Sequence, residues 1–193
     1  MKKILVINGH PRAGSYNYAV QEAYVRGLAG KEAEVREISL SELQFNLNLS
    51  EGYTAGQALE PDLVEAQTKI LWADHVVWIF PLWWGMMPAV LKGFLDRVLL
   101  PGYAFRYRPK SSLWDKLLKG KTSEIICTID YPIWYFRLFL GGGGVRVMRK
   151  MVLEFCGFKV TRTTYLGPVR PSTLAQREGW LRRVERIGMA GLS

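Results

Sequence analysis

Residues 76–98 place a strand, a loop and a helix in immediate succession, and this succession limits the folds open to the chain. Residues 76–80 are all apolar, as in a strand whose two faces are both covered by helices. Pro81 is expected to end the strand, and Pro88 suits the first turn of a helix. Apolar residues then recur at helical spacing at Leu91, Phe94, Leu95 and Val98. A strand of this kind predicts an α/β fold with helices on both faces of a parallel sheet.

The loop between this strand and helix carries apolar side chains where turns normally carry polar ones. It includes Leu82, Trp83, Trp84 and Gly85. In a doubly wound sheet, ligands bind where loops leave the carboxyl ends of central strands, and wide indole faces suit a planar ring. The two tryptophans would serve equally well in a core or a dimer interface.

A second loop with ligand-binding character follows the first apolar run, which predicts a strand over residues 3–8. Residues 9–17 contain Arg12, Gly14, Ser15 and Asn17. A helix that begins after such a loop presents free N–H groups and a positive dipole end, which together favour an anion. An N-cap role for Ser15 is the alternative, but it leaves Arg12 and Asn17 unexplained. The loop matches neither the dinucleotide fingerprint nor the nucleotide triphosphatase motif.

The rest of the chain continues the alternation of strands and helices. Further strands are expected at 34–40, 121–128 and 158–166, and helices at 62–73, 145–155 and 172–189. The expected connections are a long loop at 41–60, an aromatic turn at 100–105, an aromatic loop at 128–136 and a flexible glycine break at 141–144. Since neither a repeat nor a linker interrupts this order, residues 1–193 are expected to form one domain.

Composition narrows the possible functions. The net charge of +9 is dispersed, and its densest part, residues 170–186, is interleaved with Glu178 and Glu185, as on a solvated helix face. Nucleic-acid binding is therefore not expected. Cys127 and Cys156 lack the spacing of a disulfide framework or a zinc site, so we expect no metal site and a reduced, cytoplasmic setting. No apolar run approaches the ~20 residues of a membrane span.

Three motifs occur in one order along the chain. They are His-Pro-x-x-x-Ser-Tyr-Asn at 10–17, Pro-Leu-Trp-Trp-Gly-x-x-Pro-Ala-x-Leu-Lys-Gly-Phe-x-Asp-Arg at 81–97, and Phe-Cys-Gly-Phe at 155–158. Together they resemble the NAD(P)H:quinone oxidoreductase family of flavodoxin-like flavoproteins. The resemblance extends to about Pro168.

This resemblance implies a flavodoxin-like, doubly wound five-stranded parallel sheet in the order 2-1-3-4-5. It also implies a flavin at the carboxyl edge of the sheet and a homodimer with its sites at the interface. By motif position, His10, Ser15, Tyr16 and Asn17 would hold the flavin phosphate or pyrophosphate. Arg12, in the same loop, can add positive charge. The flavin ring would be flanked by Pro81, Leu82, Trp83, Trp84 and Gly85, and a third flavin loop would comprise Thr128, Ile129, Asp130 and Tyr131.

The third loop departs from the family pattern, which commonly reads Thr-Thr-Gly-Gly. Glycines let backbone N–H groups approach the flavin, and this chain has Asp130 and Tyr131 in their place. Asp130 near the ring would lower the flavin potential; alternatively, it caps the turn before Pro132. The mammalian enzymes of the family use a histidine beyond this loop, but this chain has no histidine after His75. His75 itself is expected only to begin a strand. Tyr131 or Tyr135 would be a substitute donor.

The implied activity is hydride transfer from NAD(P)H through the flavin to a quinone or related aromatic acceptor. The flavin carries this chemistry, so no side chain is assigned as catalytic. FMN is the expected cofactor and FAD the alternative, because no extended segment follows Ser193. A flavin-binding ancillary subunit of a transporter is the second possible function, and a structural role without flavin is the third.

Overall fold

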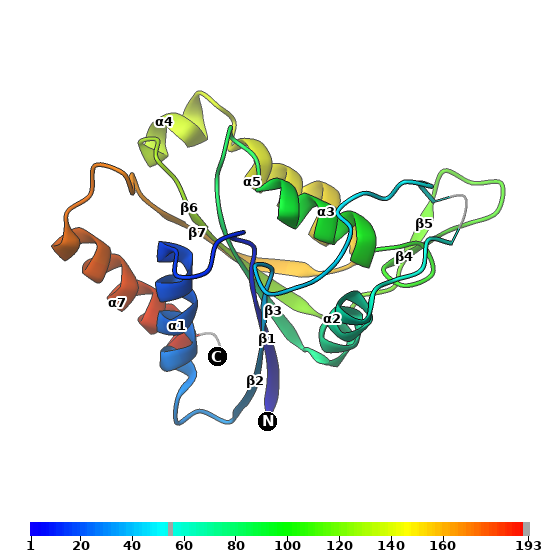
Figure 1. The fold of residues 1–193 in the computed structure, drawn as a ribbon, viewed down its shortest axis with the longest axis horizontal. Helices are drawn as coiled ribbons and strands as arrows, with labels where there is room; N and C mark the ends of the chain where they lie inside the picture. The colour runs from blue at the N-terminus through cyan, green and yellow to red at the C-terminus, as the bar shows by residue number, and fades with distance from the viewer. Residues whose placement is uncertain (54–55, 191–193) are drawn as a thin grey trace.

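The computed structural model describes residues 1–53 and 56–190. Its main sheet has five parallel strands in the order β2-β1-β3-β6-β7 (Figure 1). The strands are β1 (Lys2–Asn8), β2 (Ala33–Ser39), β3 (His75–Pro81), β6 (Thr122–Thr128) and β7 (Lys159–Leu166). Numbered within this sheet alone, the order is 2-1-3-4-5, so the predicted fold class is confirmed.

Helices cover both faces of the sheet. One face packs on α1 (Tyr16–Leu28) and α7 (Leu174–Ala190) through the apolar cluster that includes Val20, Ile79 and Ile187. The other face packs on α2 (Pro61–Trp72), α3 (Ala89–Val98) and a helical segment after the glycine run. Pro88 is the N-cap of α3 and so lies just before the first turn.

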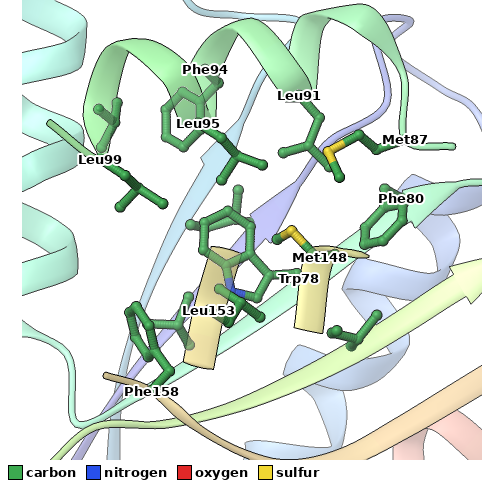
Figure 2. Close-up of a cluster of buried hydrophobic side chains, with 14 of the residues drawn as sticks. Trp78, Phe80, Met87, Leu91, Phe94, Leu95, Leu99, Met148, Leu153 and Phe158 are labelled. Atoms are coloured by element: carbon green, nitrogen blue, oxygen red, sulfur yellow. The ribbon is translucent and has the colours of Figure 1, made fainter. Parts of the chain in front are cut away.

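The larger core lies between β3, α3 and the helical segment after the glycine run. Trp78 of β3 is fully buried, and Figure 2 shows its indole among Leu95 of α3 and Met148 and Leu153. Full burial of each leucine, phenylalanine or methionine side chain in this core contributes roughly 1.5–3 kcal/mol to stability. The uninterrupted apolar run that predicted a central strand therefore reflects packing on both faces. Cys127 and Cys156 are buried and unbridged.

The predicted long loop at 41–60 contains no helix or strand in its described residues; residues 54–55 lie outside them. Arg97, at the last turn of α3, anchors this loop from inside the protein. Its guanidinium is buried, donates to the carbonyls of Asn46 and Ala58 at 2.8 Å each, and pairs with Glu60 at 2.9 Å. Removing one partner of such a buried ion pair typically costs about 3–5 kcal/mol.

The chain after β3 differs from the sequence-based expectation in three places. The aromatic turn expected at 100–105 leads into an antiparallel hairpin of β4 (Phe105–Tyr107) and β5 (Trp114–Lys116). The aromatic loop expected at 128–136 folds in part into α4 (Ile133–Leu138). The helix expected at 145–155 consists of α5 (Gly143–Val147), the π-helix η1 (Met148–Leu153) and α6 (Glu154–Cys156).

The hairpin is explained by a distant contact. The indole of Trp114 stacks on Phe155 with ring centroids 4.3 Å apart, and its Nε1 donates to the Phe155 carbonyl at 3.0 Å. Strands this short depend on such packing, which local sequence does not reveal. Across residues 1–53 and 56–190, no helix is both long and apolar enough to span a bilayer.

Candidate functional site

Three loops meet in a cavity of about 200 Å³ at the carboxyl edge of the sheet. They follow β1, β3 and β6, which are neighbouring parallel strands, so all three leave the sheet at one edge. All the predicted site residues line this cavity except Trp84, Gly85 and Tyr131. The lining residues are His10, Arg12, Ser15, Tyr16, Asn17, Pro81, Leu82, Trp83, Thr128, Ile129, Asp130 and Val169.

Two buried donors in this cavity have no partner within the described part of the chain: the Oγ of Ser15 and the Nδ2 of Asn17. Thr128 Oγ1 donates to Asn17 Oδ1 at 3.0 Å, which orients the amide and leaves its Nδ2 free to donate. A buried polar group without a partner costs about 1–3 kcal/mol. An anion in the cavity would accept from both donors, so these residues fit a phosphate.

The start of α1 adds further donors to the same place. Ser15 occupies the N-cap position, yet its hydroxyl makes no capping hydrogen bond, so the N-cap alternative does not account for it. The first N–H groups of a helix lack partners within the helix and carry the positive end of its dipole. The Tyr16 hydroxyl is already engaged, because it donates to the Arg177 carbonyl at 2.9 Å.

His10 has a neutral imidazole ring that makes a hydrogen bond within the first loop. Burial lowers the pKa of its imidazole, and its Nδ1 accepts the backbone N–H of Arg12 at 3.0 Å. This acceptor role requires an unprotonated Nδ1 and puts the ring proton on Nε2. The ring also meets Trp83 edge to face, with centroids 5.5 Å apart. His10 therefore joins the first and second loops of the site.

The second loop exposes its tryptophans. Trp84 is 99% exposed with a φ of 52°, and Gly85 follows with a φ of 73°. Left-handed backbone at a bulky residue is strained, and such strain gathers at functional sites. Trp84, Gly85 and Tyr131, the predicted residues that do not line the first cavity, line a second hollow of about 330 Å³ with Met86, Phe136, Leu140 and Gly143.

The glycine run expected to be a flexible break holds the second loop in place. The N–H of Gly144 donates to the Gly85 carbonyl at 2.7 Å. A Cβ on Gly144 would lie 2.7 Å from that oxygen, so a side chain does not fit there. Gly143 and Gly144 thus bring the start of α5 against the loop after β3.

Asp130 has a structural contact as well as a place in the cavity lining. Its Oδ1 accepts the backbone N–H of Arg170 at 2.7 Å, tying the loop after β6 to the loop after β7. Val169 of that last loop completes the cavity and was missed by sequence reasoning; its N–H donates to the Ile129 carbonyl at 3.0 Å. Its position just beyond the carboxyl end of β7 was the available signal.

Two other sequence-based expectations concern His75 and metal ions. His75 begins β3, is buried, and has its Nδ1 2.7 Å from Thr122 Oγ1. It therefore lies at the opposite end of the strand from the cavity, which agrees with a strand-entry role. Within the described residues, no cluster of His, Cys, Asp and Glu could hold a metal ion.

Comparison with known proteins gives consistent matches over nearly the whole chain. The family model described as "Flavodoxin-like fold" matches residues 2–187. NAD(P)H dehydrogenase [quinone] 1 of Rattus norvegicus is 30% identical over 97% of this chain and 78% of its own. Among solved structures, the NAD(P)H:quinone oxidoreductase from Methanothermobacter marburgensis has a TM-score of 0.81 and 26% identity, covering 100% of this chain and 98% of that one.

A more distant structure was solved with a cofactor. The FMN-dependent NADH-azoreductase from Bacillus anthracis, in complex with FMN, has a TM-score of 0.72 and covers all of both chains. At 19% identity this likeness concerns the fold.

Proposed function

The chain belongs to the flavodoxin-like fold family, and from this membership we propose that it is an NAD(P)H-dependent flavin oxidoreductase of the quinone-reductase type. Its relative at 30% identity is an NAD(P)H quinone dehydrogenase. The observation that carries the proposal is the pair of buried, unpartnered donors, Ser15 Oγ and Asn17 Nδ2, in the cavity at the carboxyl edge.

FMN is the cofactor we propose for this cavity. Ser15 and Asn17 would donate to its phosphate, with the first N–H groups of α1 beside them and Arg12 adding positive charge. Leu82, Trp83 and Ile129 line the same cavity and would border the ring. When bound, the flavin supplies hydride chemistry between NAD(P)H and an acceptor. The protein would bind, orient and shield the flavin, and no side chain is required as a nucleophile.

The second hollow suits a planar aromatic acceptor such as a quinone. Trp84, Tyr131 and Phe136 supply aromatic surface, and Met86 and Leu140 supply flexible apolar contacts. It is lined by the residues that directly follow Trp83 and Asp130 of the first cavity, so ring and acceptor would lie next to each other. Tyr131 is partly exposed there and could donate a hydrogen bond to an acceptor oxygen.

We also propose a homodimer formed through the aromatic rim of the molecule. This rim comprises exposed residues of the loop after β3 and of α4 with its flanks: Trp84, Met86, Tyr131, Trp134, Tyr135, Leu138, Phe139 and Leu140. Contiguous exposed apolar patches larger than a few hundred Å² mark interaction surfaces. A partner on this rim would cover the second hollow.

The proposed function is tested by cofactor binding together with turnover. The purified protein should bind FMN, identified by its absorbance spectrum and by mass spectrometry, and should oxidise NADH or NADPH when a quinone is supplied. Bound flavin without NAD(P)H oxidation would favour the ancillary-subunit function instead. Protein that takes up neither FMN nor FAD would contradict both functions.

The variant Ser15→Ala tests the phosphate site directly. Loss of a hydrogen bond to a charged phosphate should cost about 1.5–3 kcal/mol, so flavin should bind roughly tenfold to hundredfold more weakly. The flavin-free protein should be equally or more stable, because the Ser15 hydroxyl has no described partner to lose. Titration of FMN and urea unfolding of the flavin-free protein measure the two effects. Unchanged flavin affinity would contradict the assignment of Ser15.

A further inference from the structure

A third cavity, larger than the two described above and about 680 Å³ in volume, runs along the outer edge of β7, apart from the proposed flavin site. We call it the β7 groove. Its cationic lining residues are Arg137, Arg146, Arg149, Lys150, Arg162 and Arg183. They come from α4, α5, η1, β7 and α7, and no described residue of the lining is acidic.

The floor of the β7 groove is a free strand edge. β7 is the last strand in the sheet order and pairs with β6 on its inner side, whereas no strand of the described chain pairs with its outer side. Figure 1 shows β7 at the edge of the sheet, with α4 and α5 toward one face and α7 toward the other. Thr161, Thr163 and Tyr165 also line the groove. A free edge offers a row of N–H and C=O groups for another strand.

The cations flank this edge on both faces of the sheet. On the α4 face, the rings of Tyr165 and Phe136 have their centroids 5.8 Å apart. Burial raises the pKa of the Tyr165 hydroxyl to about 12, and the nearby positive charges of Arg137 and Arg149 oppose that rise. On the α1 and α7 face, Arg162 Nε lies 3.6 Å from Glu124 Oε1. Burial raises the pKa of Tyr24 of α1, and the positive charge of Arg162 opposes that rise. Arg183 belongs to α7 itself.

Half of these cations have no counter-ion among residues 1–53 and 56–190. Arg149 and Lys150 pair with Glu154, and Arg162 pairs with Glu124. In the described structure, Arg137, Arg146 and Arg183 have no ion pair. Charged residues on an edge strand often serve only to block aggregation. That role needs charges on the strand itself, whereas five of these six cations come from the surrounding helices.

We propose that the β7 groove binds an extended acidic segment of a partner protein, which adds to the sheet as a strand beside β7. Successive side chains of a strand point to opposite faces. Carboxylates on one face of the added strand would meet Arg137, Arg146 and Arg149, and those on the other face would meet Arg162 and Arg183. Backbone pairing would supply affinity, and the two rows of charge would set the specificity.

The free strand edge favours a peptide over a nucleic acid. A peptide backbone offers both donors and acceptors to β7, whereas a phosphodiester backbone offers no N–H donor to the β7 carbonyls. The groove also lacks the interleaved aromatic faces on which bases stack; Tyr165 is the aromatic residue of its described lining.

The proposal is tested with a fluorescein-labelled octapeptide of alternating Glu-Glu and Val-Thr pairs, added to the flavin-loaded protein. Fluorescence anisotropy should report binding. The double variant Arg146→Ala/Arg183→Ala removes two cations that lack ion pairs and should weaken binding about tenfold or more. The matched control Arg106→Ala/Arg186→Ala removes the same charge from exposed positions outside the groove and should change binding less than about twofold.

A second peptide distinguishes strand addition from simple charge attraction. Methylation of alternate backbone nitrogens keeps the carboxylates but removes donors from one edge, so this peptide should bind about tenfold more weakly. Equal binding of the two peptides, or equal losses in the groove and control variants, would overturn the proposal. Competition by a thymidine octanucleotide or by pyrophosphate at the same concentration as the peptide would also overturn it, in favour of a general polyanion site.

Discussion

Single residues in the cavity at the carboxyl edge of the sheet are of two kinds: some have polar atoms without a described partner, and others already make hydrogen bonds. Ser15 Oγ and Asn17 Nδ2 are buried without a described partner, so they are available to a ligand. Asp130 Oδ1, by contrast, accepts from Arg170. Asp130 can therefore serve the fold and the cofactor at once, which makes its charge and its hydrogen bond separately testable.

The variant Asp130→Asn removes the charge but keeps an oxygen that can accept from Arg170. If the carboxylate lies near the flavin ring, it opposes the negative charge that arrives on reduction, and its loss should make the bound flavin easier to reduce. One pKa unit of interaction is ~1.4 kcal/mol, which corresponds to about 30 mV for a two-electron couple. Redox titration of both proteins measures the shift. An unchanged potential with flavin still bound would leave Asp130 only its contact with Arg170.

His75 makes the stability of the fold depend on pH. Burial lowers the pKa of its imidazole to about 4, whereas an unfolded histidine has a pKa near 6.5. Between these values only the unfolded chain binds the proton. The stabilisation is therefore complete above about pH 6.5 and is lost as pH falls toward 4, by about 3 kcal/mol.

Urea unfolding near pH 7 and near pH 4.5 measures this contribution. The fall in unfolding free energy should be smaller in His75→Gln than in the wild type by roughly 2–3 kcal/mol, because glutamine does not titrate. Equal falls in the two proteins would show that His75 is not the group responsible.

At the scale of elements, the packing of α1 on α7 depends on two glycines. A Cβ on Gly27 would lie 2.1 Å from the Glu185 carbonyl oxygen, and one on Gly188 would lie 2.4 Å from the Tyr24 carbonyl oxygen. These neighbours are backbone atoms, so neither clash can be relieved by a rotamer change. The helices would have to move apart, and with them the start of α1 that borders the cavity.

The variant Gly188→Ala should therefore lower the free energy of unfolding by about 1–3 kcal/mol, the usual range for overpacking. Gly179→Ala, on the same helix, is the matched control. A Cβ there meets only the flexible end of Arg182 at 3.9 Å, so alanine should raise stability by about 0.5–1 kcal/mol through helix propensity. Denaturant unfolding of both variants measures whether their free energies of unfolding change in opposite directions. A stable Gly188→Ala protein would contradict the close approach.

The elements predicted well from sequence are those whose signal is local. The apolar runs of β1, β3 and β6 predicted buried parallel strands, and parallel neighbours necessarily send their loops to one edge. That argument alone predicts that Ser15, Trp83 and Thr128 lie close together. The structure places all three in the lining of one cavity.

The elements that the sequence did not predict are those stabilised by contacts with residues far away in the sequence. The β4–β5 hairpin depends on Trp114 stacking over Phe155, and no local pattern marks that pair. The aromatic run that forms α4 suits a loop as readily as a helix until Phe136 is seen buried. Val169 joins the cavity only because the loop after β7 passes over it. Likewise, sequence identified Ser15 as a donor but could not show that its hydroxyl lacks a partner.

At the scale of the whole molecule, two different surfaces both include residues of α4. The aromatic rim is apolar, whereas the β7 groove is cationic, and Arg137 of α4 belongs to the groove. An apolar surface suits a permanent, desolvated interface, and a charged edge suits a partner that associates and leaves. This division motivates a homodimer on the rim and a separate partner in the groove.

The homodimer is tested by sedimentation of the flavin-loaded protein at micromolar concentration. Leu138 is 76% exposed and Phe139 is 69% exposed, so replacing Leu138 by Glu costs a monomer little. At the centre of a dimer interface, however, the same change would bury an unpaired charge and weaken association by several kcal/mol. Leu138→Glu should therefore sediment as a monomer where the wild type is a dimer. Leu113→Glu, at an exposed leucine outside the rim, should remain dimeric. If the wild type itself sediments as a monomer with flavin bound, Trp84 and its neighbours on the rim require another explanation.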